Sequence, residues 1–220
     1  MNDAQDITAL IEILVSLAYP ELRHSRISIS WGKITSFAQI QWSQSMDRIS
    51  IRINNEVKSW HEAGITGLIS HELSHPSQKG RSTNESGTDN NVISRGLGPY
   101  LAIERLFAGK YNDHIIGSGR DRYLGYRSIR NQLTSLETQQ LNTLLTKIQL
   151  APAKPRSSIW RSHDTVVFNN EHRTTIAIEG HQFSLPENLQ NPDIKLVERN
   201  SIAYIYADEI LIGEFTVKKI

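Results

Sequence analysis

Cysteine is absent from the 220-residue chain. Its absence excludes disulfide bonds and metal sites built from thiolates. Any metal ion that this protein holds must therefore be bound by histidine and carboxylate side chains. Because structural zinc sites mostly use cysteine, these remaining ligands point to the catalytic kind of zinc site.

The chain also lacks a long apolar run and an excess of either charge. No stretch is long and apolar enough to span a bilayer. The apolar stretch Ile7–Tyr19 has no basic residue before it and contains Glu12, so we predict an amphipathic helix within Met1–Tyr19, not a signal peptide, and expect a cytoplasmic protein. Net charge is +1, which gives no reason to expect nucleic acid or a membrane as partner. Nothing in the sequence predicts an oligomeric state.

Three short segments alternate between apolar and polar residues, the period of a half-buried strand. They are Arg26–Trp31, Ala38–Trp42 and Arg48–Ile53, and polar turn residues follow each of them. We expect an antiparallel meander with one face in solvent.

A helix is predicted next, from Glu56 to His75, because apolar residues recur in it with helical period and Pro76 ends the pattern. His71 and His75 are four residues apart, so they share one helix face and can bind one metal ion. Glu72 lies one step round the helix, within reach of a water beside that ion. The alternative is a chance match on a helix surface.

A catalytic zinc site needs a third protein ligand and keeps one position for water. Glu85 and Asp89 are four residues apart on a second predicted helix, which begins near Asn84, so both face the same way. A metal-bound histidine usually donates its other ring N–H to a carboxylate. One member of this pair should therefore bind the metal and the other should hold a histidine. The alternative is a solvated helix start that the helix dipole favours.

The rest of the chain divides by composition near residue 150. Before that point we expect a helix at Tyr100–Phe107, a loop at Lys110–Gly125 and a helix within Tyr126–Ile148. Ala151–Ser158 reads as a proline-containing linker. Five alternating segments follow it: Thr165–Phe168, Thr174–Ile178, Ile194–Glu198, Ile202–Tyr206 and Ile210–Val217, with Asp208-Glu209 as a hairpin turn. We predict an α+β protein with a domain at 1–150 that carries the metal-binding pattern of metalloproteases, H-E-x-x-H, and a small β module at 151–220.

The two histidines and the two carboxylates resemble a known pattern. His71-Glu72-x-x-His75 followed by Asn84-Glu85-x-x-Thr88-Asp89 is similar to the gluzincin metallopeptidases, whose familiar member is thermolysin, and the order of elements resembles the compact minigluzincins. The resemblance implies a zincin-like core (N-terminal helix, small sheet, motif helix, glutamate helix) and a Zn²⁺ ion bound by His71, His75 and Glu85. It also implies that Asp89 holds His71.

By the same resemblance, Glu72 is the general base and acid of peptide-bond hydrolysis. A peptide or protein substrate would join an edge strand ahead of the motif helix, either Ala38–Trp42 or Arg48–Ile53. A second group for the oxyanion is often a Tyr, His or Arg. Arg95, Tyr100, Tyr111 and His114 are candidates, although a packing or surface role fits each of them better.

The sequence leaves two questions open: the function of the whole protein and the role of the β module. A binding or assembly protein with a zincin core and little or no peptidase activity would suit the β module and the short loops near the site, although such a protein does not need Glu72. The β module itself has three interpretations: substrate recruitment, latency through coverage of the cleft, and assembly. Latency is known in compact gluzincins, so it is a hypothesis for this chain by resemblance.

Overall fold

The computed structural model describes residues 4–78, 84–115, 121–153, 165–169, 174–178, 181–186 and 194–216, and the part of the predicted linker beyond Ala153 lies outside them. The helices of this part of the chain are α1 (Ala4–Leu17), η1 (Pro20–Leu22), η2 (Asn55–Ser59), α2 (Glu62–Ser77), α3 (Glu85–Val92), η3 (Ile93–Leu97), α4 (Gly98–Phe107), α5 (Tyr126–Gln132) and α6 (Ser135–Lys147). The strands before the β module are β1 (Arg26–Gly32), β2 (Ala38–Trp42), β3 (Arg48–Asn54), β4 (His114–Ile115) and β5 (Arg122–Tyr123). The protein is α+β, as predicted.

The first sheet has the strand order β1-β3-β2, with β1 parallel and β2 antiparallel to β3. The predicted antiparallel meander is therefore wrong, because β3 lies between the other two strands. Ile49, Ile51 and Ile53 of β3 are at most 1% exposed, which suits the central position. Alternation fixes which face of a strand is buried, but it does not fix which strand lies beside it.

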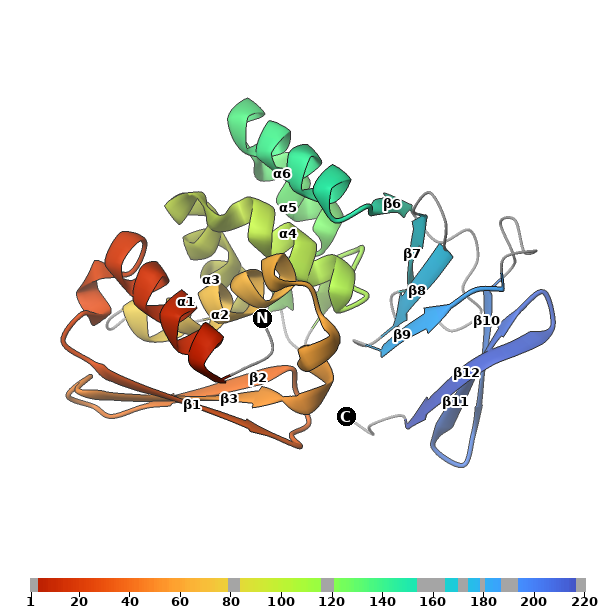
Figure 1. Cartoon of the computed structure of the whole chain (residues 1–220), viewed down its shortest axis with the longest axis horizontal. Coiled ribbons are helices and arrows are strands. Elements are labelled where there is room, and N and C mark those ends of the chain that lie inside the picture. The colour runs from red at the N-terminus through yellow and green to blue at the C-terminus, as the bar shows by residue number, and fades with distance from the viewer. Residues whose placement is uncertain are drawn as a thin grey trace.

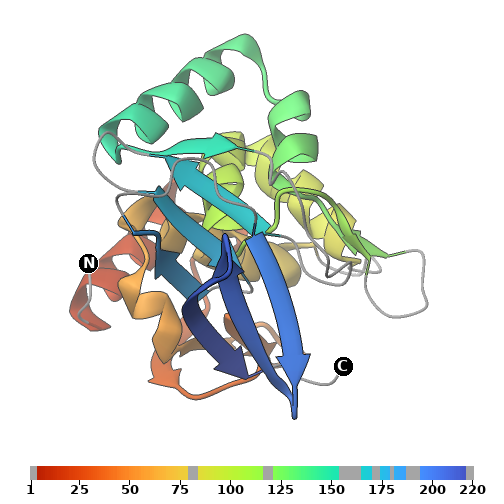
Figure 2. The same cartoon turned by 90° about the vertical axis from the view of Figure 1, so that its right-hand side faces the viewer.

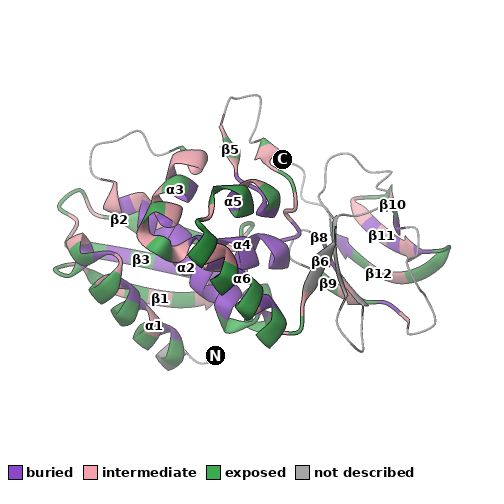
Figure 3. Ribbon diagram, turned by 90° about the horizontal axis from the view of Figure 1, so that it is seen from above, coloured by how far each residue is buried: buried purple, intermediate pink, exposed green. Residues whose placement is uncertain are grey.

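Helix α2 lies between this sheet and α4 (Figure 1). Every residue from Ala63 to Ser74 is buried, so α2 is covered on all sides and does not have the single apolar stripe that the sequence predicted. The helix also begins later and ends later than predicted, because η2 precedes it and it continues through Pro76 to Ser77. Figure 3 shows the buried residues of α2 and α4 at the centre of the larger part of the molecule, where the core lies.

The close packing of α2 on α4 depends on a glycine. A Cβ at Gly67 would lie 2.7 Å from the Cβ of Glu104 and would collide with the carbonyl of Tyr100, so only glycine lets the helices approach this closely. Gly64 faces Phe107 and Gly67 faces Tyr100, hence the two helices run in opposite directions.

The predicted helix at Tyr126–Ile148 is two helices, α5 and α6. Leu133 breaks it with extended backbone, and Thr134 then starts α6 with a capping box in which Glu137 takes part. The sequence pattern that starts a helix was therefore present inside the segment predicted as one helix. Among the described residues, no helix is long and apolar enough to cross a membrane.

The β module contains a four-stranded and a three-stranded sheet, ordered β6-β7-β8-β9 and β10-β11-β12 (Figure 2). Their strands are β6 (Ala151–Ala153), β7 (Thr165–Asn169), β8 (Thr174–Ile178), β9 (His181–Ser184), β10 (Ile194–Arg199), β11 (Ile202–Ala207) and β12 (Ile210–Thr216). β6 and β9 were not predicted. The hairpin turn at Asp208-Glu209 is confirmed, since both residues have positive φ. The module has its own hydrophobic cluster, to which Phe183 and Phe215 contribute across the two sheets.

Candidate metal centre

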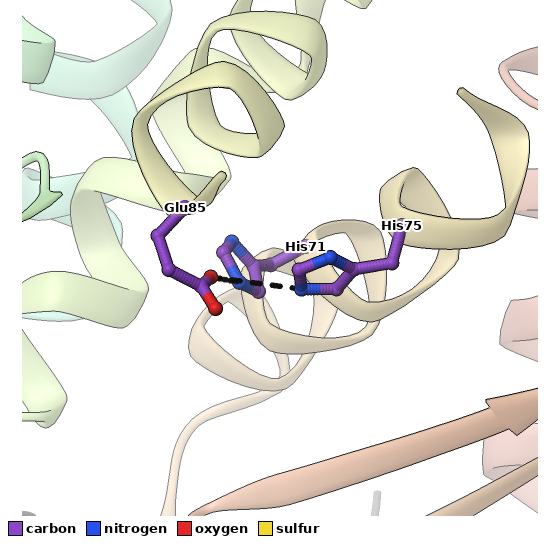
Figure 4. Close-up of side chains that lie close together, drawn as sticks. All are labelled: His71, His75 and Glu85. Atoms are coloured by element: carbon purple, nitrogen blue, oxygen red, sulfur yellow. Dashed lines mark hydrogen bonds and ion pairs between the residues drawn. The ribbon is translucent and has the colours of Figure 1, made fainter. Parts of the chain in front are cut away.

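His71, His75 and Glu85 come together and can hold a metal ion (Figure 4). Both histidines project from the second half of α2, and Glu85 is the first residue of α3. The two imidazole rings lie edge to face with centroids 5.0 Å apart, as expected for side chains one helical turn apart. The structure therefore joins the three residues that the sequence named as ligands.

The spacing of the donor atoms suits one small ion. Nε2 of His71 lies 3.1 Å from a carboxylate oxygen of Glu85, and Nε2 of His75 lies 3.6 Å from the same oxygen. Ligand atoms bound tetrahedrally at about 2.0–2.2 Å lie about 3.3–3.6 Å from one another. The observed separations fall close to that range, so an ion needs only small side-chain adjustments to bind.

Asp89 holds the far side of His71. Its Oδ1 lies 2.9 Å from Nδ1 of His71, and its side chain is fully buried. Burial alone would raise the pKa of this carboxyl, but the Arg105 guanidinium and His71 outweigh burial and hold the pKa of Asp89 below its usual range. A carboxylate that stays ionised on Nδ1 leaves Nε2 of His71 directed toward Glu85 and the ion position.

The imidazole of His71 thus lies between two carboxylates. Burial lowers the pKa of His71, but the hydrogen bonds to Asp89 and Glu85 outweigh burial and raise this pKa to about 10 in the metal-free protein. A metal ion would replace the proton on Nε2.

Glu72 is buried next to His71, and the residue is only 7% exposed. Burial raises the pKa of Glu72 to about 7, which the His71 charge opposes and the Glu85 charge reinforces. A carboxyl group poised near neutrality can both accept and return a proton at physiological pH.

The start of α3 is fixed from two sides, and this places Glu85. Asn84 caps the helix by accepting the N–H of Gly87 at 2.7 Å. The Asp121 carboxylate accepts the backbone N–H groups of Glu85, at 2.9 Å, and of Ser86, at 3.4 Å. The glutamate therefore stands at a helix end whose position depends on a residue 36 positions later in the chain.

Several residues of this site were missed by sequence reasoning. Arg105 donates to Asp89 and to the carbonyl of Leu124, whose own N–H donates to Asp89 at 2.7 Å. Tyr123 lies with its ring centroid 5.6 Å from that of His71. Burial raises the pKa of the Tyr123 hydroxyl, and the nearby Glu85 charge raises it further, so the phenol stays protonated. The adjacent charges of Glu104 and Arg105, inside an otherwise apolar helix, were the one available signal.

Two of the four residues considered for the oxyanion make structural contacts. Arg95 donates to Asn91 at 2.8 Å, pairs with Glu21 at 2.7 Å and covers the ring of Tyr19, so it joins α1 to η3. Tyr111 packs on the ring of Tyr126 with centroids 5.6 Å apart.

The backbone of Tyr100 contacts Gly67, on the packed face of α4. His114 pairs across the short hairpin with Tyr123. None of the four oxyanion candidates belongs to the metal-binding group, which among the described residues is formed by His71, His75 and Glu85.

Comparison with protein-family models, with curated proteins and with solved structures gave no match to this chain.

Proposed function

We propose that this protein is a zinc-dependent peptidase of gluzincin type, with a zincin-like core formed by α1, the first sheet, α2 and α3. The observation that carries the proposal is the convergence of His71, His75 and Glu85, in which both Nε2 atoms lie 3.1 and 3.6 Å from one carboxylate oxygen of Glu85, with Glu72 on the same turn of α2 as His71. Two imidazoles and one carboxylate, with a position left for water, are a ligand set of catalytic zinc.

When bound, zinc would polarise the scissile carbonyl and lower the pKa of the attacking water. The chain's own residues do the rest. Glu72 takes a proton from that water and delivers it to the leaving amine, and its burial beside His71 places the carboxylate next to the proposed metal position. Asp89 holds His71 in one orientation throughout.

The strand order of the first sheet favours β2 over β3 as the strand that a substrate peptide would join. β3 is paired on both sides, whereas β2 is paired only with β3 and leaves its other edge free among the described strands. An extended peptide can join such an edge through backbone hydrogen bonds. We therefore propose β2, Ala38–Trp42, as the strand that peptide substrates join.

The experiment that tests the proposal is the exchange of Glu72 for Gln. Glu72→Gln should bind as much zinc as the wild type and should lower the rate of peptide hydrolysis by about 10²–10⁴-fold, the usual contribution of a general base. Glu62→Gln is the matched control, because Glu62 is an exposed acid in the first turn of the same helix. An active Glu72→Gln protein would reject the mechanism. A zinc-loaded wild type that cleaves no peptide would favour the binding or assembly protein.

A further inference from the structure

His71 and His75 are held by different kinds of partner. Nδ1 of His71 faces the Asp89 carboxylate, whereas Nδ1 of His75 lies 3.3 Å from the hydroxyl oxygen of Thr88. Thr88 is fully buried in α3, one residue before Asp89. The proposed function gives no role to this hydroxyl.

The hydrogen-bond partners of Thr88 limit which way the bond to His75 can run. The hydroxyl lies 3.1 Å from the carbonyl oxygen of Asn84, one turn earlier, and a carbonyl can only accept. A threonine in a helix commonly donates to that carbonyl. The side-chain amide of Gln78 donates to the same hydroxyl at 3.2 Å. With its one hydrogen directed to Asn84, the oxygen is left as an acceptor.

We propose that Thr88 is the positioning residue for the second histidine: its hydroxyl oxygen accepts the Nδ1–H of His75 and leaves Nε2 to face the metal. The inference rests on the proposed metal site and assigns the partner of the second ring nitrogen of His75. Nε2 of His75 already points toward Glu85, 3.6 Å from its carboxylate oxygen. The ring N–H that a metal-bound histidine must donate is thus received by a neutral hydroxyl, and α3 supplies a holder for each histidine.

Zinc affinity of the full-length protein is the first measurement, made by competition with a chromophoric chelator. Thr88→Val keeps the shape and removes the hydroxyl, so we expect it to bind zinc about 10–100-fold more weakly. Thr88→Ser keeps the hydroxyl and should bind close to the wild-type level. Thr66→Val is the matched control, because the Thr66 hydroxyl makes the same bond to a carbonyl four residues earlier, at 2.9 Å, on the motif helix.

The ring N–H protons of the zinc-loaded protein are the second measurement, made by NMR on ¹⁵N-labelled histidines. The wild type should show a protected Nδ1–H on His75 and another on His71. In Thr88→Val the His75 signal should exchange with water while the His71 signal, held by Asp89, persists. A variant that unfolded or loosened the whole site would lose both signals.

The outcomes separate this inference from the proposed function. A wild type that binds no zinc at all overturns both. If the wild type binds zinc and Thr88→Val binds it equally tightly, the role of Thr88 is overturned and the metal site stands. The same conclusion follows if Thr88→Ser binds zinc as weakly as Thr88→Val. A His75 that carries no proton on Nδ1 in the zinc-loaded wild type also overturns it, whether or not any variant folds.

Discussion

Arg105 donates a hydrogen bond of 2.7 Å to the Asp89 carboxylate, and the two side chains are 5% and 0% exposed. The same guanidinium donates to Glu104, its neighbour on α4. A positive charge on α4 thus balances the negative charge of the carboxylate that holds His71. This pair connects the site to the core of the protein.

Replacing Arg105 with methionine should therefore destabilise the whole protein. Arg105→Met leaves Glu104 buried without its counter-charge and Asp89 with His71 alone, and removal of one partner of a buried pair costs about 3–5 kcal/mol. Urea denaturation measures the loss. Arg127→Met is the control, since Arg127 is exposed on α5 and should change stability by less than about 0.5 kcal/mol. Equal effects of the two substitutions would contradict the role of the pair.

Asp121 should matter both for α3 and for zinc. Asp121→Ala removes the acceptor of the Glu85 and Ser86 N–H groups, so we expect a loss of roughly 1 kcal/mol in unfolding free energy, typical of a lost helix cap, together with weaker zinc binding. Asp6→Ala removes an acid from the first turn of α1, whereas the candidate ligands belong to α2 and α3, and should leave zinc affinity unchanged. Unaltered zinc affinity in Asp121→Ala would show that Glu85 is placed without it.

Zinc should stabilise the folded protein by mass action. At a free zinc concentration about 100 times the dissociation constant the gain is about 2.7 kcal/mol, which corresponds to a rise in melting temperature of about 5–10 °C for a chain of this size. His71→Ala should lose this rise. His24→Ala, which removes an exposed histidine, should keep it. A rise of the same size in His71→Ala would place the ion elsewhere.

The metal-free protein should become less stable as the pH rises above neutrality. The pKa of His71 is raised from 6.5 to about 10, so its charged form stabilises the fold fully below pH 6.5 and this contribution is lost as the pH passes through about 10. Urea midpoints measured in EDTA across that interval should fall for the wild type and fall less for His71→Asn. Parallel curves for the two proteins would exclude a charged His71.

Removal of residues 151–220 tests the latency hypothesis for the β module. Between the described parts, one contact of the module with the core lies at Gly109, where an added Cβ would come within 2.8 Å of the Ala177 carbonyl oxygen. That position follows α4 and, because α2 and α4 are antiparallel, it lies near the start of α2, whereas His71 and His75 lie in its second half. We expect the shortened chain to keep its zinc and to hydrolyse peptides no faster. A faster rate would favour latency.

The sequence by itself determined the candidate ligands, because their geometry is local. Two histidines four apart on α2, and two carboxylates four apart on α3, share helix faces wherever those helices lie. This spacing left open which carboxylate joins the histidines and which one holds His71, and only the resemblance implied the assignment. The structure places Glu85 in the group that can hold a metal ion and Asp89 on His71. The α+β class followed from periodicity.

Only the tertiary structure decided what supports the ligands. The central place of β3, the charge of Arg105 on Asp89, the cap that Asp121 provides and the hydroxyl of Thr88 under His75 all depend on which elements lie side by side. Periodicity reports which face of an element is buried, and carries no information about the element that covers it. Contacts between residues far apart in the chain arise from packing the whole core, and the supporting residues of the site belong to those contacts.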